Sequence, residues 1–178
     1  MGLSVSLTRA GMACRVLAAA PPPWWGGGVS EIERKFRVAR VPDGLGDGAP
    51  LRQAYVAVDG GVEVRVRSDG DDHVLTVKGG SGLERTEVEV GIDADAFAEL
   101  WALAGDRHLE KTRHRVEVDG GTAELDLYGG DLAGLAVVEV EFPTREAADR
   151  FTPPDWFGDE LTGRPGWSNA ELARDGAP

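Results

Sequence analysis

The chain has 178 residues and a formal net charge of −12, with 19 lysines and arginines against 31 aspartates and glutamates. With 42% hydrophobic residues and no apolar run near the roughly 20 residues of a membrane-spanning helix, the composition is that of one soluble globular domain. The acidic excess repels polyanions at long range and disfavours nucleic acid and anionic membranes as partners. The single cysteine, Cys14, excludes an internal disulfide and fits a cytoplasmic location.

The first segment of the chain, residues 1–30, differs in composition from the rest. It has no acidic residue, and its last ten residues are PPPWWGGGVS. Arg9 and Arg15 interrupt every apolar stretch that could serve as a secretory signal. We predict a disordered extension, of the kind that a start assigned upstream of the natural one would produce. The folded domain is predicted over 31–174, with a short tail at 175–178.

From residue 31 to residue 142 the hydrophobic pattern has a period of two, which is typical of half-buried strands. In 31–38, for example, one face carries two glutamates, a lysine and an arginine, whereas the other is mostly apolar. Turns rich in glycine and aspartate favour antiparallel hairpins between several segments. Eight strands are predicted: 31–38, 51–58, 62–67, 74–78, 85–90, 111–116, 124–127 and 138–142.

Three helices are also predicted. Asp93 can cap a helix over 94–104, whose apolar residues recur at helical spacing. Thr144 can start a short helix that ends near Arg150. Residues 168–171 (SNAE) form a capping box that opens a C-terminal helix.

The charged faces of the strands decide how the sheet is expected to close. Taken singly, each face would meet water, but together the faces hold almost only carboxylates and basic groups. The opposite faces are apolar and need cover, which the helices can provide from outside. Eight antiparallel strands can close into a barrel and so remove unpaired edges. We therefore predict an α+β, mainly β fold: a closed eight-stranded antiparallel tunnel barrel with a charged lumen, flanked by a few short helices.

The lumen face is balanced in charge, so the acidic excess of the chain lies outside it. Burying these groups costs more than their pairing returns unless a ligand uses them. Carboxylates without thiols or clustered histidines favour Mg²⁺ or Mn²⁺, and arginine and lysine bind phosphate. The pattern predicts a cation that bridges carboxylates and phosphate oxygens. The face comprises nine basic residues (Lys35, Arg37, Arg65, Arg67, Lys78, Arg85, Lys111, Arg113, Arg115) and nine acidic ones (Glu31, Glu33, Glu63, Glu87, Glu89, Glu124, Asp126, Glu139, Glu141).

The sequence also resembles a known family. The segment EIERK at 31–35 is a Glu-x-Glu-x-Lys pattern, and further blocks follow in order. They are RQAY (52–55), RVR (65–67), TVK (76–78), EVE (87–89), EKTR (110–113), ELD (124–126), VEVEF (138–142), PPDWFG (153–158) and WSNA (167–170). Over 31–174 the chain thus resembles the CYTH proteins, or triphosphate tunnel metalloenzymes, and especially their short bacterial inorganic triphosphatase-like members. Ala54 stands where the family often has glycine.

The resemblance implies an eight-stranded tunnel that binds a linear triphosphate with Mg²⁺ or Mn²⁺. Lys111 and Tyr55 match a Lys/Tyr pair that has been proposed to assist catalysis. Lys111, surrounded by arginines, is biased toward its neutral form, which suits a general base. The implied metal ligands are Glu31, Glu33, Glu139 and Glu141, with Asp126 and Glu124 nearby; the implied phosphate ligands are Lys35, Arg65, Arg67, Lys78, Arg113 and Arg115; Glu87, Glu89 and Arg85 support them.

The implied activity is metal-dependent hydrolysis of the terminal phosphoanhydride of inorganic triphosphate. Tyr55 is the one aromatic residue on the predicted lumen face apart from Tyr128 at a strand end, so no clear platform exists for stacking a base or thiazole ring. Thiamine triphosphatase and class IV adenylate cyclase remain alternatives, as does a noncatalytic binder of polyphosphate or nucleotide. The expected partner is a small anionic substrate, with no nucleic acid or membrane, and the protein is expected to be a monomer or homodimer.

Overall fold

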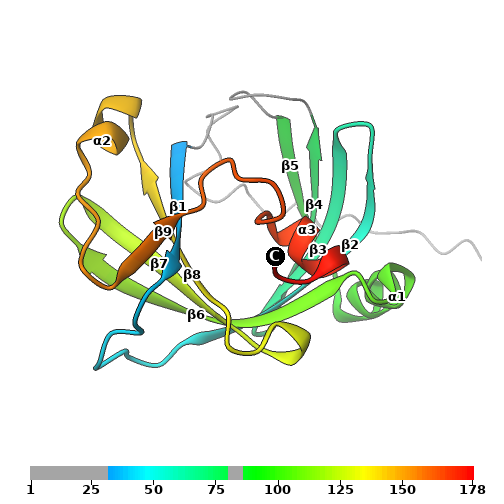
Figure 1. Ribbon diagram of the computed structural model, residues 1–178. Coiled ribbons are helices and arrows are strands. Elements are labelled where there is room, and N and C mark those ends of the chain that lie inside the picture. Colours follow the sequence, from blue (N-terminus) through cyan, green and yellow to red (C-terminus); the bar gives the residue numbers. More distant parts are fainter. Residues whose placement is uncertain (1–31, 80–85) are drawn as a thin grey trace, which may run out of the picture.

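The computed structural model describes residues 32–79 and 86–178, which form one antiparallel sheet with three α-helices and a 3₁₀ turn (Figure 1). All eight predicted strands are present. The elements are β1 (Ile32–Val38), β2 (Ala49–Asp59), β3 (Val62–Asp69), β4 (Asp72–Gly79), β5 (Thr86–Gly91), α1 (Ala94–Ala104), β6 (His108–Val118), β7 (Gly121–Tyr128), η1 (Gly130–Leu132), β8 (Ala136–Phe142), α2 (Arg145–Arg150), β9 (Phe157–Glu160) and α3 (Asn169–Asp175). The extension predicted at 1–30 lies outside the described residues.

The prediction of a closed eight-stranded barrel is wrong. The sheet has nine strands in the order β5-β4-β3-β2-β6-β7-β8-β1-β9, and within the described ranges β5 and β9 are its two edges. An eight-stranded barrel would close by pairing β5 with the outer edge of β1. In the structure β9 pairs with that edge of β1 instead. Leu161 extends this contact by donating its backbone N–H to the Lys35 carbonyl at 2.8 Å.

The strand β9 escaped prediction because it is short and carries little alternation. It has four residues, FGDE, of which only Phe157 is a large apolar residue. Gly158 shows how closely the two strands approach, since a Cβ there would lie 3.0 Å from the Arg37 carbonyl oxygen. A close backbone approach of this kind is invisible in a period-two pattern.

The convex face of the sheet is apolar and is covered by two helices, as expected. Under α2, Phe36, Val138 and Phe151 belong to one buried cluster. Phe97 and Ala104 of α1 form a second buried cluster with Ala54 and Val66 of the sheet. Both predicted N-caps are confirmed, with Asp93 accepting from the Ala96 N–H and Thr144 from the Ala147 N–H. Figure 1 shows α1 and α2 outside the curve of the sheet.

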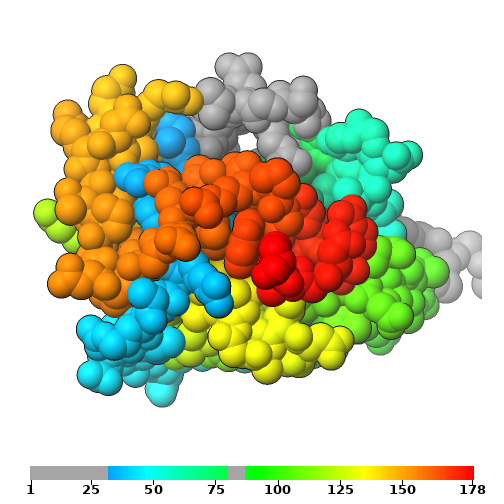
Figure 2. Space-filling view, viewed as in Figure 1, coloured from blue at the N-terminus to red at the C-terminus, as the bar shows by residue number. Residues whose placement is uncertain are grey.

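The third helix, α3, lies inside the curve, contrary to the expectation that the helices cover the sheet from outside (Figure 1). Its predicted capping box is present between Ser168 and Glu171. Leu172 packs against Leu109 and Val137, which interrupt the charged pattern at one end of the concave face. Figure 2 shows the C-terminal segment, coloured orange to red, lying across this face of the molecule. No helix in the described ranges has the length and apolar character needed to cross a membrane.

Candidate functional site

The strand register brings the predicted charged residues together on the concave face. Ladder partners share a face of a sheet, and Lys35 lies opposite Glu139 while Arg113 lies opposite Asp126. Glu31 and Arg85, which were also predicted, lie outside the described residues. The predicted residues that the ladder places on this face are Glu33, Lys35, Arg37, Tyr55, Glu63, Arg65, Arg67, Lys78, Glu87, Glu89, Lys111, Arg113, Arg115, Glu124, Asp126, Glu139 and Glu141.

The most buried part of the site is a cluster of two cations around one carboxylate. Lys111 and Asp126 are 4% and 1% exposed, and the Lys111 Nζ lies 2.5 Å from Asp126 Oδ2. Arg113 donates to both oxygens of Asp126 at 2.7 Å. Such bidentate, charge-assisted bonds are among the strongest in proteins. Asp126 therefore holds two basic side chains in fixed positions.

Burial and pairing act against each other on the pKa values of this cluster. Burial would raise the pKa of Asp126, but the hydrogen bonds from Arg113 and the charge of Lys111 outweigh it, so the pKa lies below its usual value. Burial lowers the pKa of Lys111, and Asp126 opposes that shift. The direction for Lys111 is the one expected of a general base, but its main cause is burial rather than the neighbouring arginines.

A second set of ion pairs joins this cluster to β1 and β8. Lys35 Nζ lies 2.7 Å from Glu139 Oε1, and Glu139 Oε2 lies 3.5 Å from Arg113. Glu124 accepts a hydrogen bond from Arg113 and lies 3.5 Å from Arg115. The Arg115 side chain is 73% exposed, so Arg115 lies at the rim, where an ion pair contributes little stability.

The opposite wall, formed by β3, β4 and β5, holds three basic groups that differ in how closely a carboxylate accompanies them. Lys78 pairs with Glu87 at 3.0 Å, whereas Arg65 comes only within 4.0 Å of Glu89. The Nε of Arg65 is buried and has no hydrogen-bond partner among the residues that the structure describes. Arg67 makes no ion pair with any carboxylate in residues 32–79 or 86–178. This wall therefore has donors that an added anion could satisfy.

Tyr55 lies between the two walls and is fully buried. Gln53, two residues earlier on the same strand, donates from Nε2 to the Tyr55 hydroxyl oxygen at 2.7 Å. Burial raises the pKa of Tyr55 well above its usual value, and the nearby Arg65 opposes this only in part, so the phenol keeps its proton. No hydrogen bond links Tyr55 to Lys111 in the described part of the chain. Lys111 instead lies 5.7 Å from the ring centroid of Tyr128.

Sequence reasoning missed Gln53, and it placed Tyr128 only at a strand end. The alternation of β2 puts Gln53 on the same face as Tyr55, and this was the signal that could have identified it. Tyr128 donates its hydroxyl hydrogen to Asn169 Oδ1 at 2.6 Å, which links α3 to the site. That contact joins residues from separate parts of the chain and has no local signature.

The carboxylates have the donor chemistry that Mg²⁺ or Mn²⁺ requires, but basic side chains already accompany several of them. Glu33 faces Glu141 and Glu124 faces Glu139 on neighbouring strands. Within the described ranges no three carboxylates converge as a set that could hold a metal ion. Asp126 differs from the others because both of its oxygens accept hydrogen bonds from Lys111 and Arg113. A metal is therefore better matched to the glutamates than to Asp126.

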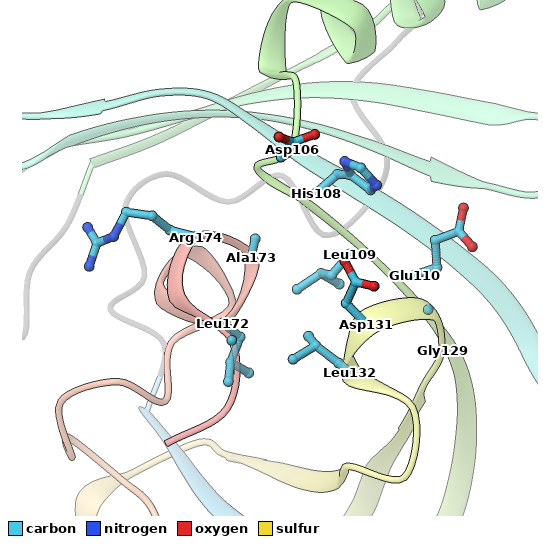
Figure 3. Close-up of a pocket in the computed structure, with 12 residues that line it drawn as sticks. Asp106, His108, Leu109, Glu110, Gly129, Asp131, Leu132, Leu172, Ala173 and Arg174 are labelled. Carbon is cyan, nitrogen blue, oxygen red and sulfur yellow. The ribbon is translucent and has the colours of Figure 1, made fainter.

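A cavity of about 440 Å³ lies beside the site, between β6, η1 and α3 (Figure 3). Leu109, Leu132 and Leu172 form its apolar part, while Asp106 and Asp131 are among its acidic residues. None of the predicted site residues lines it. Its acidic side chains would repel a polyphosphate, so the concave face remains the candidate site.

Comparison with known proteins identifies clear relatives. The CYTH domain model matches residues 30–161. An inorganic triphosphatase of Nitrosomonas europaea is 43% identical over 147 residues, which cover 82% of this chain and 97% of that protein. One from Acetivibrio thermocellus is 36% identical over 148 residues, covering 82% and 94%. A crystal structure of an inorganic triphosphatase has a TM-score of 0.67 at 41% identity, covering 83% of this chain and 97% of that one.

Proposed function

Because the chain belongs to the CYTH domain family, we propose that it hydrolyses the terminal phosphoanhydride of inorganic triphosphate in a metal-dependent reaction. Both of the relatives described above carry the name inorganic triphosphatase, and they align over nearly their whole length. The products would be pyrophosphate and phosphate. We further expect a cytoplasmic monomer or homodimer that acts on this small anion without nucleic acid or membrane.

The observation that carries the proposal is the buried Nε of Arg65, for which the described part of the chain offers no hydrogen-bond acceptor. Leaving a buried donor unsatisfied costs about 1–3 kcal/mol, and more for a charged group. Phosphate oxygens would satisfy it, and Arg67, on the same face of β3, would add a second guanidinium, which pairs with no carboxylate among residues 32–79 and 86–178. We assign this wall to binding the phosphate chain, with Lys78 as a further ligand.

The wall formed by β1, β6, β7 and β8 would hold the reacting end of the substrate. Lys35, Lys111 and Arg113 present positive charge there, and Asp126 keeps two of them in place. Arg115, at the rim, would meet the substrate as it enters. We assign Glu33, Glu139, Glu141 and Glu124 to the metal, together with Glu31 outside the described residues. When bound, Mg²⁺ or Mn²⁺ would supply positive charge to the phosphate oxygens.

The chemical step proposed is attack of water on the terminal phosphorus, with the bond to the bridging oxygen breaking and pyrophosphate leaving. The fixed cations stabilise the charge that develops on the transferred group and on the leaving group. Tyr55 is protonated and so can donate a hydrogen bond to a reacting oxygen. Lys111 can serve as general base only after losing a proton beside Asp126; burial favours that loss and the carboxylate opposes it.

A substrate without an organic part fits the concave face best. Its two tyrosines, Tyr55 and Tyr128, are buried and their hydroxyls are engaged by Gln53 and Asn169. Neither is an exposed ring on which a base or thiazole could stack. This favours inorganic triphosphate over ATP or thiamine triphosphate.

The test is phosphate release from triphosphate, pyrophosphate, ATP and thiamine triphosphate, each with Mg²⁺, with Mn²⁺ and with a chelator. We expect triphosphate to be the best substrate, chelation to abolish turnover, and Glu33→Gln to reduce it strongly. Exposed Glu110 provides the matched control, since Glu110→Gln should leave turnover unchanged. Triphosphate binding without phosphate release under any metal would establish a binder instead, and cyclic AMP formed from ATP would establish a cyclase.

A further inference from the structure

The glutamine beside Tyr55 is a buried polar side chain in the floor of the site. Gln53 is 2% exposed and Tyr55 is 1% exposed, and both lie on the concave face of β2. Across the ladder, Gln53 faces Arg67 and Leu109, while Tyr55 faces Arg65. An apolar residue would fill the same space without needing a hydrogen-bond partner. Packing alone therefore does not explain why a polar side chain occupies this buried position.

The hydrogen bond between the two residues has a direction. An amide nitrogen only donates, so the Tyr55 oxygen accepts from Gln53 Nε2 at 2.7 Å. The phenol hydrogen is then directed elsewhere, and no residue in 32–79 or 86–178 accepts it. Arg65, on the adjacent strand, has a buried Nε that also lacks an acceptor within these two ranges. Two neighbouring donors on the concave face are therefore available to oxygen atoms of a ligand.

We propose that Gln53 is a positioning residue for triphosphate cleavage, which holds the Tyr55 oxygen as an acceptor so that the phenol hydrogen is donated to a substrate oxygen. Gln53 itself touches Tyr55 and acts through it. This role rests on the proposed function. It implies that removing the amide misdirects the phenol without removing any phosphate ligand, so that turnover falls more than substrate affinity.

The composition of the chain allows the contact to be observed directly. Gln53 is the only glutamine and Asn169 the only asparagine, so a ¹H–¹⁵N spectrum contains one side-chain amide pair from each. Each amide contacts a different tyrosine, Tyr55 for Gln53 and Tyr128 for Asn169. Tyr55→Phe should move a hydrogen-bonded Gln53 amide proton upfield and leave the Asn169 pair in place. Tyr128→Phe is the matched control and should leave the Gln53 pair in place.

Kinetics test the functional consequence. We expect Gln53→Met and Tyr55→Phe each to lower kcat for triphosphate by about tenfold, with KM within about twofold of wild type. The double variant should be no slower than Tyr55→Phe alone, because both changes remove the same oriented phenol. Gln53→Glu places an acceptor at the same length, reverses the hydrogen bond and should also lower kcat.

The outcomes separate this role from the proposed function. A wild-type protein that releases no phosphate from triphosphate overturns both. An active wild type with an equally active Gln53→Met, or single-variant effects that multiply in the double variant, overturns the positioning role alone. If Gln53→Met fails to fold, the amide spectrum still decides, since a Gln53 pair that Tyr55→Phe does not move means that the amide does not donate to the phenol.

Discussion

Replacing Asp126 by asparagine should destabilise the fold strongly. The change keeps the size and shape of the side chain but removes the charge that Lys111 and Arg113 share. Asp126 is 1% exposed and Lys111 is 4% exposed, so water cannot replace the lost partner. Breaking a buried ion pair on one side costs about 3–5 kcal/mol, because the remaining charge stays buried without compensation. A domain of this size has a total stability of roughly 5–15 kcal/mol.

The assays are urea unfolding and thermal unfolding of wild type and Asp126→Asn, both monitored by the fluorescence of the five tryptophans. At about 2–4 °C per kcal/mol, the melting temperature should fall by roughly 6–20 °C. Glu110→Gln is the matched control, since the Arg52–Glu110 pair joins neighbouring strands at a distance of 3.1 Å but is about half exposed. It should cost less than about 1 kcal/mol. A loss below about 1 kcal/mol in Asp126→Asn would show that the cluster does not depend on this charge.

Three further predictions concern Lys111, Asp126 and Arg34. Lys111→Met should lower kcat by about 10²-fold or more, as expected for a general base or a transition-state cation, and a turnover within about threefold of wild type would rule out the base role. Acid should destabilise the fold, because the pKa of Asp126 is depressed in the folded state. Its stabilising contribution is present above the unfolded-state pKa of about 3.9 and is lost as the pH falls through the folded-state pKa. Urea unfolding at stepwise lower pH should therefore show a loss of stability that Asp126→Asn lacks. Arg34→Met should lower the free energy of unfolding by about 1–3 kcal/mol, because Arg34 joins Glu160 of β9 and the Ala148 carbonyl of α2 to β1; an unchanged urea midpoint would contradict this.

Local pattern was sufficient for eight of the nine strands, for the three α-helices and for the composition of the charged face. The period of two in each strand places alternate residues on one side, so Lys35, Lys111 and Asp126 could be assigned to a common face without knowing how the strands pair. Helix caps are also local, and those at Asp93, Thr144 and Ser168 are present as expected. These features depend on residues within one turn or one strand.

Partner choice within the site could not be predicted in the same way. The family resemblance implied that Lys111 works with Tyr55, which stays a prediction. The register of β6 and β7 adds Asp126 as the partner of Lys111, and Gln53 as the donor to Tyr55, which local pattern did not indicate. A shift of two residues in register would keep every side chain on the same face and change all of these contacts. The partners therefore depend on how whole strands align.

The sequence by itself determined that the chain forms an antiparallel, mainly β domain with one apolar and one charged face, because strand alternation and helix capping are set by neighbouring residues. Only the tertiary structure decided that the sheet stays open and that α3 lies within it. Both outcomes depend on contacts between distant segments: β9 occupies the edge of β1, and Leu172 meets Leu109 and Val137 on the concave face. A strand edge accepts one partner, and which segment takes it depends on the packing of the whole chain.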